Sequence, residues 1–193
     1  MIMSAQISQD QIRIFKEATP AVMALRLEEQ EVCSYWGLIF SAKGIASLTK
    51  QDMTGFMRFE QNRRWKDISK ENITEDMEAL KVALSLLIDE ARTISERIND
   101  IEPGRGEHAV PHLGKAKLSA ILLVTNPRKY GVWNDYSERA LRGLGLFPEF
   151  EETWHLGEQY EAVNKVLVNL ATEYGLTMWW LDVILEKVAR LVR

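Results

Sequence analysis

The sequence contains one cysteine and three histidines among 193 residues. A single cysteine, Cys33, excludes an intrachain disulfide and any zinc site built from cysteines. The histidines His108, His112 and His155 lack the spacing of a metal site, because Pro111 interrupts any helix between the first two. The sequence also has no nucleotide-phosphate loop and no Gly-x-Ser-x-Gly elbow. We therefore expect no metal and no cofactor.

The chain also has no long apolar run. No stretch approaches the roughly 18 consecutive apolar residues that are needed to cross a bilayer. Residues 1–10 do not combine a charged segment with an apolar core, so they do not resemble a secretory signal. We therefore expect no membrane partner and a cytoplasmic protein.

A basic excess is missing too, since the net charge is −4, and this disfavours an indiscriminate nucleic-acid binder. The charge is nevertheless segregated. Residues 58–70 hold five basic and two acidic residues (net +3), and residues 103–145 hold seven basic and three acidic residues (net +4). If these two segments share a face, that face would attract phosphate despite the acidic total.

The first basic segment contains Arg63 and Arg64 beside Trp65. An indole ring next to arginines is suited to stack on an unpaired base, so we predict a DNA contact here. The alternative is a buried tryptophan flanked by solvated arginines.

The apolar residues recur at helical spacing, and no sustained alternation typical of strands is present. This pattern predicts an all-α, multi-helix domain of roughly eight or nine helices. The domain covers residues 1–193 and can be divided into a helical lobe (1–102) and a lobe containing a helical hairpin (103–193). The expected helices begin near Ser8, Thr19, Thr49, Thr74, Leu113, Asp135, Tyr160 and Thr177.

Local signals predict several helix ends. The second helix should be mostly buried and run to Gly44. Thr49 and Thr74 should cap the next two helices, and the second of these should break near Thr93. Gly145 and Gly175 should end two later helices, because glycine readily adopts the left-handed conformation.

Residues 110–146 carry the strongest functional pattern. A turn at residues 110–114 leads into a helix that begins with Lys115 and Lys117. A turn followed by a helix presents unpaired backbone amides and a positive dipole end to a phosphate. Lysines in a first turn work against the helix dipole, and two of them together suggest an anionic partner. The alternative is an ordinary solvated face.

This stretch resembles the helix-hairpin-helix core of the endonuclease III-type DNA glycosylase superfamily. That pattern is a Leu-Pro-Gly-Val-Gly hairpin, an apolar helix, a loop, then an Asp and a helix ending in Arg-Leu-Gly. Residues 110–114 (Val-Pro-His-Leu-Gly) occupy the hairpin, residues 120–123 the apolar helix and residues 142–146 the closing turn. His112 stands where the first hairpin glycine would favour a positive φ.

The resemblance implies base excision, with a lysine nucleophile and a carboxylate. The family lysine position falls on Ala116 and the family aspartate on Asn134. A shift of one residue in each gives Lys117 as nucleophile and Asp135 as carboxylate. The alternatives are a chain that has lost this activity, and an Asp135 that only caps its helix, with Glu138 completing a capping box.

The resemblance also implies DNA as the partner. The expected contacts in the second basic segment are Arg105, His112, Gly114 and Lys115.

Residues 59–65, 131–134, 157–160 and 176–182 are similar to an uncharacterised prokaryotic family that is associated with restriction or defence. That similarity favours the alternative function, a non-enzymatic interaction or DNA-recognition protein with a protein partner or as a homodimer.

Overall fold

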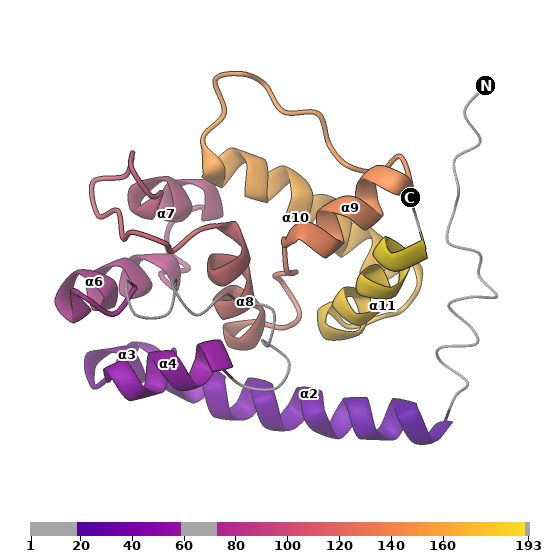
Figure 1. Cartoon of the computed structure of the whole chain (residues 1–193), viewed down its shortest axis with the longest axis horizontal. Coiled ribbons are helices and arrows are strands. Elements are labelled where there is room, and N and C mark those ends of the chain that lie inside the picture. The colour runs from indigo at the N-terminus through magenta and orange to yellow at the C-terminus, as the bar shows by residue number, and fades with distance from the viewer. Residues whose placement is uncertain (1–18, 59–72, 192–193) are drawn as a thin grey trace.

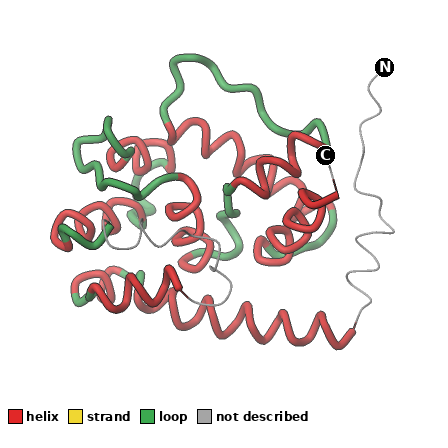
Figure 2. The backbone as a smooth tube through the Cα atoms, viewed as in Figure 1, coloured by secondary structure: helices red, strands yellow, loops and turns green. Residues whose placement is uncertain are grey.

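The computed structural model describes residues 19–58 and 73–191 (Figure 1). Within these ranges the chain forms nine helices and no strand (Figure 2), which confirms the all-α prediction. The helices are α2 (Thr19–Ile39), α3 (Ala42–Ala46), α4 (Lys50–Arg58), α6 (Met77–Leu87), α7 (Ile94–Ile101), α8 (Lys115–Thr125), α9 (Asp135–Gly143), α10 (Leu156–Glu173) and α11 (Met178–Leu191). None of the helices in these ranges is long and apolar enough to cross a membrane.

Several predicted helix ends are confirmed. Thr49 caps α4: its hydroxyl accepts the backbone amide of Asp52, and the Asp52 carboxylate accepts the backbone amide of Thr49. The break near Thr93 separates α6 from α7, and Thr93 caps α7 in a capping box with Glu96. Gly145 and Gly175 follow the ends of α9 and α10 with φ of 69° and 59°. Their left-handed conformation lets the next amide bond back to the last turn of the helix.

Two predicted ends are wrong. Thr74 does not cap α6, because the Asp76 side chain accepts the amide of Ala79 and fixes the helix start there. The second helix does not reach Gly44 but ends at Ile39, and Ser41 then caps the short helix α3. Gly44 allows this turn, because a Cβ there would lie 2.3 Å from the carbonyl oxygen of Ile39.

Helix α8 lies at the centre of the core. Each residue from Leu118 to Val124 is buried, so the helix is covered on all its sides over this stretch. Helix α2 packs against it, and Gly37 permits the close approach, because a Cβ there would lie 2.9 Å from the carbonyl oxygen of Val124. One large cluster of buried side chains extends from Trp36 to Ala189.

Helix α2 runs along one edge of the molecule (Figure 1). Only one side of it contacts the core, and Leu27, Tyr35 and Leu38 are 59%, 59% and 73% exposed. The prediction of a mostly buried helix is therefore wrong for its outer face. Cys33 lies between the two faces and is half-buried.

A buried arginine connects the α6–α7 turn to the loop after α8. Arg97 is only 1% exposed, and its guanidinium donates to the Leu87 carbonyl (2.8 Å), Glu90 (3.1 Å) and the Tyr130 hydroxyl (2.5 Å). The Tyr130 hydroxyl donates in turn to Glu90 at 2.7 Å, and Lys129 also pairs with Glu90. The contacts of Tyr130 and Lys129 join groups more than 30 positions apart along the chain, so the network fixes how these segments meet.

We expect Arg97→Met to lower the free energy of unfolding by about 3 kcal/mol, because it leaves buried acceptors without their donor. Tyr130→Phe should lower it by about 1–2 kcal/mol, since one hydroxyl is lost from the same network. Urea unfolding measures both values. Glu78→Gln, which changes an exposed ion pair with Lys81, is the control and should stay within about 0.5 kcal/mol. Equal effects for the control and Arg97→Met would contradict the structural role of the network.

Candidate functional site

The turn before α8 has an unusual backbone at His112. Its φ is 66°, and it is the one non-glycine residue with positive φ in the described part of the chain. A residue with a Cβ loses roughly 1–2 kcal/mol in this conformation. The position corresponds to the first glycine of the hairpin pattern, so the backbone takes a conformation suited to glycine although the residue is histidine. The side chain of His112 is exposed.

The amino terminus of α8 has no side-chain cap. Gly114 occupies the N-cap position, and its carbonyl accepts the amides of Lys117 (3.0 Å) and Leu118 (3.1 Å). The first amides of a helix have no acceptor within the helix itself. A Cβ added at Gly114 would meet nothing within 4 Å, so the space beside Gly114 is open.

The two lysines of the first turn have different surroundings. Lys117 donates to the carbonyl of His112 at 2.7 Å, and burial lowers the pKa of its ammonium group. Lys115 pairs with Glu138 of α9 at 2.6 Å. Residues two positions apart leave a helix about 200° from each other, so the two lysines point to different sides of α8.

The Glu138 carboxylate accepts four hydrogen bonds from three residues. We call Glu138 and these residues, which are Lys115, Trp133 and Arg142, the Glu138 cluster. Arg142 donates twice, at 3.0 and 2.9 Å, and the Trp133 indole donates at 3.1 Å. The Lys115 ammonium also lies 4.6 Å from the centre of the Trp133 ring. Burial raises the pKa of Glu138, but the bonds from Lys115 and Arg142 lower it, and the net result lies below the ordinary 4.5.

Sequence reasoning did not assign Glu138 to a site. The spacing of Glu138 and Arg142 fits a helical ion pair, and this was the available signal. The contact with Lys115 joins residues 23 positions apart, and only the fold brings them together.

Aromatic side chains from the segment after α9 support this cluster. Phe147 and Phe150 pack on Trp133, with ring centres 6.3 and 5.7 Å away. The guanidinium of Arg142 lies 3.9 Å from the centre of the Phe147 ring. The backbone amide of Trp133 donates to the buried hydroxyl of Ser119 at 2.9 Å, which ties the cluster to α8.

The carboxylate predicted for catalysis, Asp135, is exposed and is the first residue of α9. It does not cap this helix. Asn134 does, and its side-chain oxygen accepts the amides of Tyr136 and Ser137. The capping box is completed by Ser137 and not by Glu138. The interpretation of Asp135 as the N-cap is therefore wrong. The N-cap position belongs to Asn134, whose side chain already bonds the first backbone amides of the helix.

The remaining predicted contacts are spread along the chain. The structure brings His112, Gly114 and Lys117 together at one turn and directs Lys115 towards Glu138. Arg105 is exposed in the loop after α7. Arg63, Arg64 and Trp65 lie outside the described residues.

We expect Glu138→Gln to lower the free energy of unfolding by about 1–2 kcal/mol near neutral pH, because a charged acceptor of four donors is lost. The pKa of Glu138 is lower in the folded state than in the unfolded chain. Its stabilisation is therefore present above about pH 4.5 and is lost as the pH falls through the folded-state pKa. The difference between wild type and Glu138→Gln should shrink on acidification.

Urea unfolding at about pH 7 and about pH 3 measures this difference. Glu107→Gln, at an exposed loop position, is the matched control. A difference for Glu138→Gln that is the same at both pH values would contradict the assignment.

Comparison of the chain with protein families, with curated proteins and with solved structures gives no match. The resemblance to a helix-hairpin-helix element thus depends on residues 110–146 themselves.

Proposed function

We propose that the chain binds duplex DNA and that the turn at residues 110–114, with the amino terminus of α8, holds a backbone phosphate. The observation that carries the proposal is the open, uncapped start of α8 behind the left-handed His112. Backbone amides at such a terminus point at the ligand, and the helix dipole favours negative charge there.

The lysines of α8 support the proposal. Cations in the first turn of a helix are unfavourable for the helix itself, and α8 has no acidic residue in that turn. A phosphate at the terminus would relieve this conflict. Lys115 already pairs with Glu138, whereas Lys117 lies at the turn itself and donates to the carbonyl of His112, so Lys117 is the lysine that we expect to contact the phosphate.

We expect duplex DNA to bind with an affinity that falls steeply between about 50 and 200 mM salt. Lys117→Gln should weaken binding and reduce the slope of log affinity against log salt by about 1, because one phosphate contact is lost. Glutamine can still donate to the His112 carbonyl, so the turn is kept. Fluorescence anisotropy with a labelled duplex measures the slope.

The matched control is Lys165→Gln, which removes an exposed lysine from α10. It should leave affinity and slope almost unchanged. No binding at low salt, or equal weakening by both variants, would remove the proposal and leave the alternative of a protein-interaction module.

A second candidate function is base excision by Lys117, and the lowered pKa of this lysine favours it. The neutral amine is the nucleophilic form of lysine, and burial favours this form over the charged ammonium. The Lys117 amine would attack C1′ of a flipped nucleotide, and the base would leave with the bonding electrons. The bond between C1′ and the sugar ring oxygen then breaks, and a Schiff base forms as the amine gives one proton to the departing base and one to the ring oxygen. Asp135 would stabilise the developing positive charge.

Borohydride reduces such a Schiff base to a stable amine and so links the protein to DNA. If Lys117 is the nucleophile, duplexes with abasic or modified sites should give a linked product with wild type and none with Lys117→Arg. Arginine keeps the charge that binding needs but does not act as the amine. A product that persists in Lys117→Arg would contradict the role of Lys117. Retained binding without any product would leave the DNA-binding proposal alone.

A further inference from the structure

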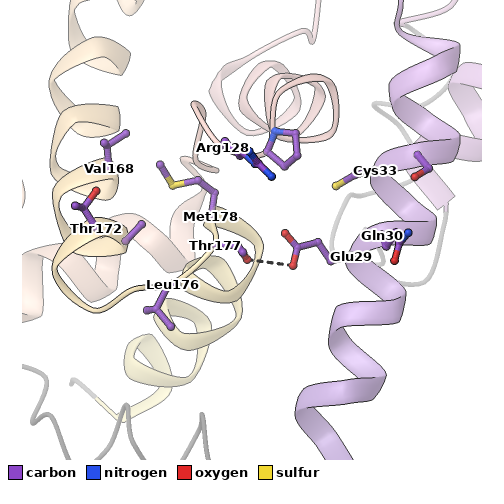
Figure 3. A pocket seen from close by; sticks show the side chains of 12 residues that line it. Glu29, Gln30, Cys33, Arg128, Val168, Thr172, Leu176, Thr177 and Met178 are labelled. Carbon is purple, nitrogen blue, oxygen red and sulfur yellow. Dashed lines mark hydrogen bonds between the residues drawn. The ribbon is translucent and has the colours of Figure 1, made fainter.

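A pocket opens at the other end of α8, between α2 and the junction of α10 and α11 (Figure 3). Its volume is about 500 Å³, within the range of about 300–1,000 Å³ that is typical of small-molecule sites. Helix α8 has 11 residues and is therefore about 16 Å long. The pocket and the turn at residues 110–114 are at opposite ends of it, so the pocket is separate from the proposed phosphate site.

Arg128 supplies a positive charge on one wall. Its side chain is exposed and has no hydrogen-bond, ion-pair or ring partner among residues 19–58 and 73–191. Figure 3 shows it directed into the space between α2 and Met178. A guanidinium binds a carboxylate or phosphate through two parallel hydrogen bonds, so an unpaired one in a pocket points to an anionic ligand.

The wall formed by α10 and the start of α11 is mostly apolar. Val168, Ala171, Leu176 and Met178 line it. Ala171 and Met178 are almost fully buried, at 6% and 3% exposure, so they belong to the fixed core and do not depend on a ligand for their position. An apolar surface of this kind accommodates the hydrocarbon part of a ligand.

The opposite wall carries a negative charge. Glu29 of α2 accepts a hydrogen bond from the Thr177 hydroxyl at 3.1 Å, and both side chains line the pocket (Figure 3). A carboxylate in this position repels a second negative charge on the ligand. It disfavours dianions and also a nucleic-acid backbone, which carries a charge at every phosphate.

We propose that this pocket binds a small monoanion with an apolar body, such as a short-chain carboxylate. The charged group of the ligand pairs with Arg128, and its hydrocarbon part lies on Val168, Leu176 and Met178. Glu29 sets the limit of one negative charge.

The only cysteine of the chain lines the same pocket and can report its occupancy. Burial raises the pKa of the Cys33 thiol to about 11, so modification by methyl methanethiosulfonate should be slow enough to follow by mass spectrometry. Three probes of equal carbon number separate charge from apolar contact: hexanoate, 1-hexanol and adipate. Hexanoate should slow the modification of Cys33 in a saturable manner, and the other two should do so at least tenfold more weakly.

Variants assign the effect to named groups. Arg128→Met should weaken protection by hexanoate about tenfold or more, when the rate with hexanoate is divided by the rate of the same variant without probe. In the control variant Arg139→Met, which changes an exposed residue of α9, hexanoate should protect Cys33 as well as it does in wild type. Glu29→Gln retains an acceptor for Thr177 but removes the charge, so adipate should then protect nearly as well as hexanoate.

The proposal is overturned if hexanoate gives no saturable protection of Cys33 or if 1-hexanol protects equally well. It is also overturned if hexanoate protects Cys33 in Arg128→Met as well as in wild type. Adipate protection that equals hexanoate protection in wild type would overturn the limit set by Glu29. None of these results bears on DNA binding, which is measured separately and is proposed for the other end of α8.

Discussion

The structure depends on one buried cation, the guanidinium of Arg97. A charge removed from water is tolerated only when its donors are satisfied, and here they bond Leu87, Glu90 and Tyr130. The constraint continues along the chain, because the next residue, Gly131, donates to Asn164 (2.8 Å) and accepts from Tyr160 (3.0 Å). The loop therefore reaches α9 in one orientation, which places the Trp133 indole and then Glu138 opposite Lys115. The candidate site is thus positioned by a charge that lies outside it.

Within the site, the distribution of charge is more informative than its sum. Residues 103–145 have a net charge of +4, but two of their basic residues, Lys115 and Arg142, form ion pairs with Glu138. Part of the apparent basic surface is therefore committed to holding α8 and α9 together. The start of α8, which has no side-chain cap, and the ammonium of Lys117 are a smaller and more localised feature than the sequence count implies. Contact with one phosphate of a DNA backbone matches that feature better than a contact spread over many phosphates does.

The order of the helices was predictable from sequence because it follows from local chemistry. Thr93 with Glu96, Gly145 and Gly175 each act within a few residues of themselves, and the structure has their helix ends as predicted. Two of the errors arose where neighbouring polar residues compete for the N-cap position, as with Thr74 and Asp76, or Asn134 and Asp135. The side chain of Asn134 also lies 3.5 Å from Asp182 of α11, a long-range relation that no local pattern contains. The Glu138 cluster and the pocket at Arg128 were not predictable for the same reason, and the roles of Lys117 and Asp135 in DNA chemistry remain predictions.

Helix α8 carries a further consequence. With seven consecutive residues buried, it can neither rotate nor slide without disturbing close-packed neighbours on every side. It acts as a rigid spacer, and the turn at its start and the Arg128 loop at its end are held at a constant separation. Substitutions at residues 118–124 have no solvent-facing position to absorb a change in volume. Sequence divergence at α8 must therefore occur together with compensating changes in the helices that surround it.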